Sequence, residues 1–286
     1  MVGMLAILDQ LIGDGFRHYY FRQKSGMLYR TTYTIDSTKA DLLIFGSSRA
    51  SHHYIPMIFK NELHLSSYNS GRDGCDLIYY AGAISAILHR YTPKHIIIDL
   101  LPNELSFTEG SKYAPLLPYH DNPVIDSFIK SNSKTEKYKL LSRIYPYNSL
   151  FATIISGNKS NYDHDDQGYI ELDKTMEPHK RELFKQGKII PGRVSLLDDL
   201  LTKLSKRKIN TTLVISPAHY LFANNDTSVK IFKNLTHRFK NITFINYEND
   251  PRFSGDSLYQ DAYHLNNSGA IKFSKDLADK LAADHH

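Results

Sequence analysis

Cysteine is nearly absent from this sequence, because its 286 residues include only Cys75. A single cysteine forms no intrachain disulfide and cannot build a zinc site from several cysteines. A chain of this length can bury a large apolar core without disulfides or metals to hold it together. The cysteine usage fits a reducing compartment, and it equally fits a periplasmic protein that has no need of disulfides.

Long apolar runs are also missing. The best candidate, residues 4–12, is about half the length that a membrane-spanning helix needs, and it carries Asp9. It is too short, and preceded by too little positive charge, to be a secretory signal. We predict an amphipathic helix over residues 4–24 and leave open whether residues 4–12 are the stub of a longer membrane anchor.

A strong charge of either sign is missing too, since 35 basic and 30 acidic residues give a net charge of +5. The densest basic cluster, residues 203–208, alternates with Leu and Ser as a solvated helix face does. No motif that combines basic and aromatic residues accompanies it, so we expect no nucleic-acid partner. An anionic polymer or ligand stays open.

Apolar residues are arranged in a regular pattern along the chain. Short apolar runs predict strands, and stretches with helical spacing follow them, in the order strand 41–45, helix 49–60, strand 65–68, helix 76–90, strand 95–100, helix 195–207, strand 211–215, helix 227–239, strand 242–245 and helix 267–282. This alternation predicts a three-layer α/β/α sandwich with a central, mainly parallel, flavodoxin-like sheet of about five strands.

The alternation predicts one main domain. We expect an N-terminal helix and linker over residues 1–38, and a single α/β domain over 39–286 with an insertion at about 106–192. Long insertions at the carboxyl edge of such a sheet often form lids or binding walls. The tyrosines of the insertion suit stacking on sugar rings or, alternatively, pack a small core of their own: Tyr113, Tyr119, Tyr145, Tyr147, Tyr162 and Tyr169.

Two serines directly follow the first predicted strand, in the motif Gly46-Ser47-Ser48-Arg49. Ligands of α/β sheets bind at the carboxyl ends of the strands, so a serine hydroxyl here lies where chemistry is expected. The N-terminus of the next helix would stabilise negative charge that develops nearby. The alternative is that Ser47 or Ser48 only caps the helix, which is a common use of serine.

A second candidate lies between the last strand and the last helix, in the motif Asp261-Ala-Tyr-His264. An Asp three residues before a His can hold the imidazole Nδ1–H, which leaves Nε2 outward as a base. The alternative is a surface loop, because the chain holds 14 His and one such match is expected by chance. The serine motif follows the first strand and this pair lies just before the last helix. That placement favours a catalytic role over a surface loop.

The serine motif followed by Asp261 and His264 resembles the SGNH (GDSL-type) hydrolase superfamily. The resemblance makes Ser48 the nucleophile, His264 the base and Asp261 the residue that orients it. It also implies an oxyanion hole formed by the N–H groups of Ser48 and Gly74, with Gly71 in reserve, and by the amide of Asn103. It implies no cofactor and no metal.

The sequence departs from the pattern of that family at two places. Ser47 replaces the acid beside the nucleophile, and Leu101-Pro-Asn-Glu104 lacks a glycine and has Glu where the family has Asp. In this respect the chain resembles the membrane-anchored proteins that O-acylate cell-envelope polymers more than the secreted lipases. That resemblance implies a cell-envelope location, with a possible membrane-bound acyl-transfer partner; the alternative is a cytoplasmic protein.

Other polar residues lie near the predicted site. Arg49 and Arg72 are expected to hold an anionic substrate group or, equally, to pair with Asp73 or Asp99, and His219 either lines the pocket or has a structural role. Adjacent histidines, His52 and His53, suggest a metal site, but neighbours on a helix point in different directions. We expect surface or ligand-lining histidines there instead.

Together these features predict a serine esterase or O-acyltransferase that acts on acyl esters of a carbohydrate or cell-envelope polymer, the acyl group being most simply acetyl. The alternative is an SGNH-fold carbohydrate-binding or assembly module without activity. Neither the choice between hydrolysis and transfer nor the oligomeric state follows from the sequence.

Overall fold

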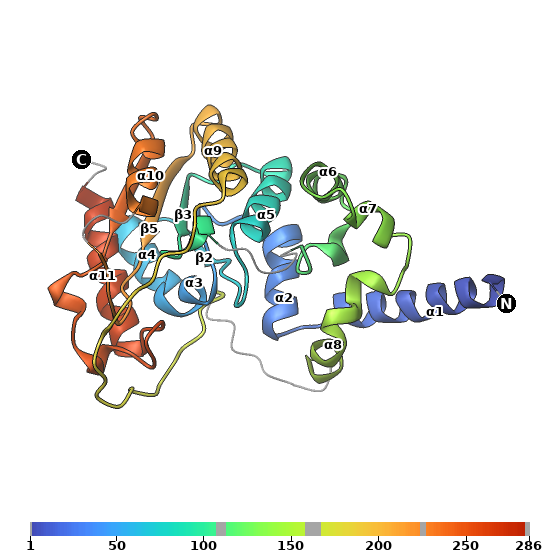
Figure 1. Ribbon diagram of the computed structural model, residues 1–286, viewed down its shortest axis with the longest axis horizontal. Helices are drawn as coiled ribbons and strands as arrows, with labels where there is room; N and C mark the ends of the chain where they lie inside the picture. The colour runs from blue at the N-terminus through green and yellow to red at the C-terminus, as the bar shows by residue number, and fades with distance from the viewer. Residues whose placement is uncertain (1, 107–112, 158–166, 224–226, 284–286) are drawn as a thin grey trace. The chain divides into compact units, whose positions relative to one another are not determined.

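The computed structural model describes the whole chain except residues 1, 107–112, 158–166, 224–226 and 284–286 (Figure 1). Its contacts divide the chain into two compact units. The sheet unit comprises residues 39–77, 92–109 and 166–286, and the helical unit comprises residues 1–38, 78–91 and 110–165. The domain boundaries given above stay a prediction, and each unit is described by itself.

The sheet unit is built on five parallel strands in the order β2-β1-β3-β5-β7. They are β1 (Leu42–Phe45), β2 (Ser67–Asn69), β3 (His95–Asp99), β5 (Asn210–Ile215) and β7 (Ile242–Asn246). All residues of β1 and β3 are buried, as the near-continuous apolar runs of a sheet covered on both faces require. The predicted α/β sandwich with a central parallel sheet of five strands is confirmed.

Helices cover this sheet. Helix α11 (Asn267–Ala283) packs against α3 (Ser48–His53) and α4 (Pro56–Leu63), whereas α9 (Pro191–Lys206) and α10 (Thr227–Thr236) pack against each other and on β5 and β7. The apolar stripe of α11 enters the core through Phe273, Leu277 and Leu281. A separate two-stranded sheet joins β4 (Glu182–Leu183) to β6 (Tyr220–Leu221).

The helix predicted over residues 49–60 is wrong as a single element, because the structure divides it into α3 and α4. Tyr54 and Ile55 between them are extended. Pro56 is the cause, since a proline has no N–H to continue a helix and favours an extended residue before it. Pro56 instead begins α4, a position that proline suits. The break keeps α3 short and fixes where its last residue, His53, lies.

The helical unit contains no strand among its described residues. Its helices are α1 (Val2–Phe21), α2 (Gly26–Thr32), a π-helix (Tyr33–Ser37), α5 (Leu77–Arg90, from Ile78 on), α6 (Pro123–Asn132), α7 (Glu136–Lys139) and α8 (Phe151–Gly157), with 3-10 turns at Leu117–Tyr119 and Tyr145–Leu150. Arg90 joins α5 to the end of the π-helix by donating to the carbonyls of Thr34, Ile35 and Thr38.

The predicted insertion spans both units, and most of its tyrosines are buried. Tyr119 and Tyr147 pack edge-on or tilted against Tyr20 of α1, each with ring centroids 5.8 Å apart, and the Tyr20 hydroxyl donates to that of Tyr119. Tyr113 and Tyr169 are buried as well, Tyr145 is half-buried, and Tyr162 lies outside the described residues. For the four buried tyrosines, core packing is therefore the interpretation that the structure supports.

Helix α1 ends at Phe21, three residues before the predicted boundary. The apolar side chains of its first half are exposed: Met4, Leu5, Ile7, Leu8, Leu11 and Ile12. Within the described part of the chain, no helix combines the length and the apolar character that crossing a membrane requires.

Gly46 is a position at which the sheet unit depends on the absence of a side chain. Its φ is +150°, and a Cβ there would lie 2.8 Å from the Asp99 carbonyl oxygen and 2.9 Å from the Ala50 Cβ. We expect Gly46→Ala to lower the free energy of unfolding by about 1–3 kcal/mol from backbone strain alone, with a further loss from the contacts. Urea unfolding measures this. The control is Gly192→Ala, where an added Cβ meets nothing within 4 Å, and an equal loss in both variants would contradict the explanation.

Candidate functional site

Ser48 is the first residue of α3, and it lies three residues beyond Phe45, the last residue of β1. Its side chain is half-buried at the carboxyl edge of the sheet. Ser47 occupies the N-cap position, but its side chain makes no capping hydrogen bond, and among the residues that the structure describes its buried Oγ has no hydrogen-bond partner. Helix capping therefore does not explain either serine.

The structure brings Ser48, His264 and Asp261 together. His264 Nε2 lies 2.7 Å from Ser48 Oγ, and His264 Nδ1 lies 2.9 and 3.0 Å from the two carboxylate oxygens of Asp261. A carboxylate accepts the Nδ1–H, so Nε2 presents its lone pair to the Ser48 hydroxyl. Such a chain of nucleophile, base and orienting carboxylate can take a proton from the serine and return it.

The turn that carries Asp261 holds its carboxylate in place. Asp261 Oδ1 also accepts the backbone N–H groups of Tyr263 and His264, at 2.8 and 3.0 Å. Burial raises the pKa of Asp261, but the hydrogen bonds from His264 and from the Tyr263 backbone outweigh it and hold the pKa below its usual value. Asp261 is therefore ionised at neutral pH, as a residue that orients an imidazole should be.

Of the two candidate oxyanion glycines, Gly71 is already used in the fold. Its N–H donates to Asn69 Oδ1 at 2.9 Å, and a Cβ on Gly71 would lie 2.5 Å from the Ser51 backbone nitrogen, so this glycine allows β2 to approach α3. Gly74 is exposed and has φ +69°. Gly74 is thus the position that remains for an oxyanion donor from this loop.

Asn103 is half-buried in a turn that begins at Leu101 and leads into the 3-10 turn Glu104–Ser106. The unusual Glu104 of this motif anchors the turn. Its buried carboxylate accepts the N–H of Leu77, the first residue of α5, at 2.6 Å and that of Leu101 at 3.3 Å. Glu104 therefore has a structural reason to be present, which the family resemblance did not supply.

Arg49 points into the protein rather than toward a substrate. It is almost fully buried, lies 3.7 Å from Asp99 as an ion pair and donates to Ser216 Oγ from Nε at 3.1 Å and from Nη2 at 2.8 Å. Asp99 in turn accepts the Tyr54 hydroxyl at 2.7 Å and the Ser216 N–H at 3.1 Å. The second of the two interpretations given for Arg49, pairing with Asp99, is what the structure contains.

Arg72 and His219 are buried as well. The Arg72 N–H donates to the Gly46 carbonyl at 3.1 Å, and the Arg72 side chain hydrogen bonds to the thiol of Cys75. His219 Nε2 lies 2.6 Å from Asp256, and the backbone N–H of His219 donates to Ala262 in the loop of the candidate site. These contacts favour a structural role for the two side chains over a direct contact with substrate.

The adjacent histidines of α3 are not at the surface. His52 Nδ1 donates to the Ile170 carbonyl at 2.8 Å, and His52 Nε2 lies 3.5 Å from the Asp73 carboxylate. The His52 ring packs edge-on against that of His264, with centroids 5.5 Å apart. His53 is completely buried. Sequence analysis missed both as neighbours of His264. Their spacing of four and five residues from Ser48 is the only signal that the sequence offers.

The one cysteine is not a competing nucleophile. Cys75 is buried beside the Gly74 loop, and burial raises the pKa of its thiol to about 12. The thiol is therefore protonated at neutral pH and unreactive. Among the residues that the structure describes, no three His, Cys, Asp or Glu side chains are grouped as a metal ion would require.

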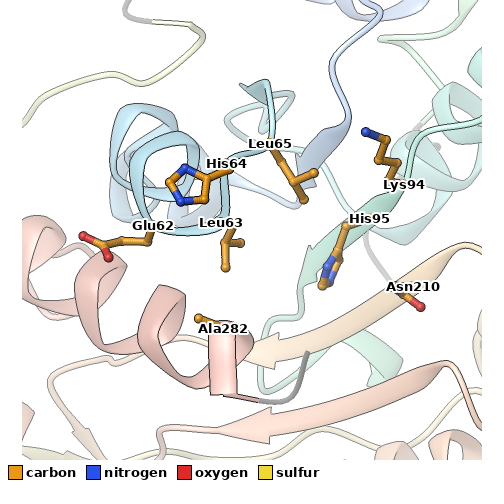
Figure 2. A pocket seen from close by; sticks show the side chains of 8 residues that line it. All are labelled: Glu62, Leu63, His64, Leu65, Lys94, His95, Asn210 and Ala282. Carbon is orange, nitrogen blue, oxygen red and sulfur yellow. The ribbon is translucent and has the colours of Figure 1, made fainter. Parts of the chain in front are cut away.

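A pocket of about 390 Å³ lies at the other edge of the sheet, where β3 and β5 begin (Figure 2). Its lining consists of Glu62, Leu63, His64, Leu65, Lys94, His95, Asn210 and Ala282. In a parallel sheet all carboxyl ends lie at one edge, so Ser48 and this pocket are at opposite ends of the strands. The pocket therefore does not serve the Ser48 site.

Comparisons with known proteins find similar structures but no family. No protein-family model matches the sequence, and no curated protein matches it. A solved structure from Streptococcus pneumonia, provisionally described as a platelet activating factor, is similar with 11% identity and a TM-score of 0.46 over 98% of this chain and 97% of that one. An acetyl xylan esterase from the rumen bacterium Butyrivibrio proteoclasticus is similar with 11% identity and a TM-score of 0.38, over 85% of this chain and 63% of that one. At this similarity neither likeness bears on the activity of this chain.

The burial of Arg49 gives a testable prediction. We expect Arg49→Met to lower the free energy of unfolding by about 3–5 kcal/mol, because it leaves the Asp99 carboxylate buried without its cation. Chemical denaturation measures this loss. Arg238→Met is the matched control, since Arg238 and Asp198 form an exposed pair, and such pairs contribute at most about 1 kcal/mol. A substrate-binding Arg49 would show the opposite pattern, with a raised KM at unchanged stability.

Proposed function

We propose that this protein is a serine hydrolase of acyl esters of the SGNH type, with Ser48, His264 and Asp261 as its catalytic residues. The observation that carries the proposal is the hydrogen-bonded chain Asp261–His264–Ser48 at the carboxyl edge of a parallel sheet. That edge is where α/β folds bind their ligands. The half-buried Ser48 hydroxyl is reachable, whereas the other nucleophile nearby, Cys75, is buried and protonated.

In this proposal the reaction has two steps. Ser48 Oγ attacks the ester carbonyl while His264 Nε2 takes its proton, and the imidazolium that forms is stabilised by Asp261. The tetrahedral intermediate collapses to an acyl-enzyme as His264 gives the proton to the leaving alcohol. In the second step His264 takes a proton from water or from an acceptor hydroxyl, whose oxygen attacks the acyl-enzyme carbonyl. The second tetrahedral intermediate collapses as the bond from the acyl carbon to Ser48 Oγ breaks and His264 returns the proton to Ser48 Oγ, which releases the acyl product. Water gives an esterase, and a sugar hydroxyl gives an O-acyltransferase.

The negative charge of the intermediate needs hydrogen-bond donors. We assign this role to the backbone N–H groups of Ser48 and Gly74 and to the side-chain amide of Asn103. The firm anchoring of the Asn103 turn by Glu104 supports the assignment, because donors that are fixed in advance cost no reorganisation during the reaction. The residue before Asn103 is Pro102, which further restricts the turn.

We propose a carbohydrate ester, most simply an acetyl ester, as the substrate. Tyr263 supports this, because it lies inside the Asp261–His264 turn with 48% of its surface exposed and its ring centroid is 6.4 Å from that of His264. Its ring is also 5.0 Å from that of Tyr220 on β6. Two neighbouring tyrosine rings, one of them next to the proposed base, offer flat apolar faces with polar edges, which suits a sugar ring.

A cell-envelope location, with a membrane-bound partner that supplies the acyl group, is the remaining part of the proposal. The exposed apolar side chains in the first half of α1 support it, because large contiguous apolar patches usually mark an interaction surface. A cytoplasmic esterase is the alternative. Localising a fluorescent fusion of the full-length protein distinguishes the two.

The central test is the serine itself. We expect Ser48→Ala to abolish ester turnover and labelling by a fluorophosphonate, while the free energy of unfolding changes by no more than about 1 kcal/mol, the net value of one hydrogen bond. Ser47→Ala is the matched control and should keep both activities, since Ser47 Oγ is buried and makes no hydrogen bond. Wild-type protein that is folded but is neither labelled nor active would favour a binding module without activity.

The sugar-binding role of Tyr263 has its own test. We expect Tyr263→Ala to raise KM for an acetylated oligosaccharide about fivefold, which corresponds to the loss of about 1 kcal/mol of ring contact. The effect on kcat should be small, because the backbone N–H that Tyr263 donates to Asp261 remains. Tyr138→Ala, an exposed tyrosine on α7, is the control. An unchanged KM in the Tyr263 variant would remove the support for a sugar ring at this position.

A further inference from the structure

A buried polar layer lies directly behind the Ser48–His264 pair, and His53 is its central member. His53 is the last residue of α3, the helix that Ser48 begins, and it is completely buried. Its Nε2 lies 3.0 Å from the backbone nitrogen of Leu265, and its Nδ1 lies 2.9 Å from Ser216 Oγ. The reaction proposed above gives no role to this histidine.

The protonation state of His53 follows from its partners. A backbone N–H can only donate, so His53 Nε2 must be without a proton to accept the N–H of Leu265. The proton of the neutral ring is then on Nδ1, from which it is donated to Ser216 Oγ. Burial, reinforced by the nearby positive charge of Arg49, holds the pKa of His53 well below its usual range. His53 is therefore a neutral ring with one fixed tautomer.

The position of Leu265 gives this hydrogen bond its importance. Leu265 follows His264 directly, and its buried backbone is held between α3 and the core. The bond from Leu265 N–H to His53 Nε2 therefore ties the loop of the base to the helix of the nucleophile. Together with the bond between Ser48 and His264, it closes a ring: Ser48, along α3 to His53, across to Leu265, back to His264 and across to Ser48.

His53 is itself held from behind. Ser216, the acceptor of its Nδ1–H, follows β5, and its N–H donates to Asp99 at the end of β3. The same Ser216 hydroxyl accepts from Arg49, the neighbour of Ser48. The orientation of the His53 ring is therefore set by two central strands of the sheet, and the ring transmits that orientation to Leu265.

We propose that His53 is a positioning residue for the base: through its hydrogen bond to the Leu265 backbone it keeps His264 Nε2 within hydrogen-bond distance of Ser48 Oγ. This inference rests on the proposed function, in which His264 acts on Ser48. His53 touches neither substrate nor the reacting oxygen, so its effect is on geometry alone. A misplacement of about 1 Å in such a pair is enough to cost about 10²-fold in rate.

Two substitutions separate the two hydrogen bonds of His53. In His53→Gln the side-chain oxygen is the same number of bonds from Cα as Nε2, so it can still accept the Leu265 N–H. In His53→Asn the amide nitrogen is the same number of bonds from Cα as Nδ1, so it can still donate to Ser216 but no group reaches Leu265. The pair is matched in polarity and chemistry, and it differs in which bond survives.

We expect His53→Asn to lose about 10²-fold in kcat with little change in KM, and His53→Gln to stay close to wild type. Both are measured on a small acetyl ester well below the melting temperature of each variant, so that a loss of folded protein does not contribute. A purely structural His53 predicts lower melting temperatures and unchanged kcat in both variants. That result, or a Gln variant as slow as the Asn variant, would overturn the proposal.

Crystal structures of the wild type and both variants give a readout that needs no activity. We expect the distance from His264 Nε2 to Ser48 Oγ to lengthen in the Asn variant and to stay near its wild-type value in the Gln variant. An unchanged distance in the Asn variant contradicts the positioning role. If the wild type is neither active nor labelled by a fluorophosphonate, the proposed function fails, and the distances still decide whether His53 positions His264.

Discussion

The arrangement of the candidate site depends on one buried ion pair, Arg49 with Asp99. Arg49 follows Ser48 on α3, and Asp99 is the last residue of β3. Burial raises the pKa of Asp99, and the nearby Arg49 cation opposes this shift. Two charges in the interior are stable only with the help of further hydrogen bonds. Tyr54 and Ser216 donate to one Asp99 carboxylate oxygen, and Arg49 donates to Ser216 Oγ. The pair therefore fixes α3 against both β3 and β5.

Local packing accounts for the two departures of the sequence from the SGNH pattern. Ser47 is buried under α3, where an acid would add a further charge close to the Arg49–Asp99 pair. Glu104 has a longer side chain than Asp, and this side chain accepts the backbone N–H of Leu77, the first residue of α5, and lies 4.0 Å from the guanidinium of Arg193. Glu104 therefore belongs to the support of the site. The identities of the two residues thus follow local packing and say nothing against a reaction at Ser48.

Sequence analysis could predict the sheet and the placement of Ser48, Asp261 and His264 because both depend on short-range patterns. Buried parallel strands are continuous apolar runs, and residues that directly follow them share one edge. These patterns do not predict which groups Arg49 contacts. One residue along a helix turns a side chain by about 100°, so Arg49 points inward beside an outward Ser48, and only the folded chain shows which group meets it.

The polar layer was beyond prediction for a different physical reason. The layer brings together four separate segments of the chain, and no spacing in the sequence links them. The four residues are His53, Asp99, Ser216 and Leu265. A buried histidine and a surface histidine look alike in a single sequence, because the difference is made by the partners that satisfy the ring. Besides the spacing from Ser48, Pro56 was a local signal: by ending α3 after His53, it fixes the last turn of the helix where this ring meets Ser216 and Leu265.

These contacts separate the residues of the site into a buried group and an exposed group. The layer below Ser48 is closed, since Arg49, His53 and Asp99 are buried and engaged with one another through Ser216. It can hold the reacting groups but cannot select a substrate. Selection must then come from residues that remain open at the same edge, and Tyr263 is the one that lies within the turn of the base itself. In the proposed function, the turn from Asp261 to His264 carries both the base and the surface that meets the substrate. Substitutions of Asp261 and His264 should therefore change the reaction rate, and those of Tyr263 the affinity for substrate, whereas substitutions in the buried layer should change rate and stability.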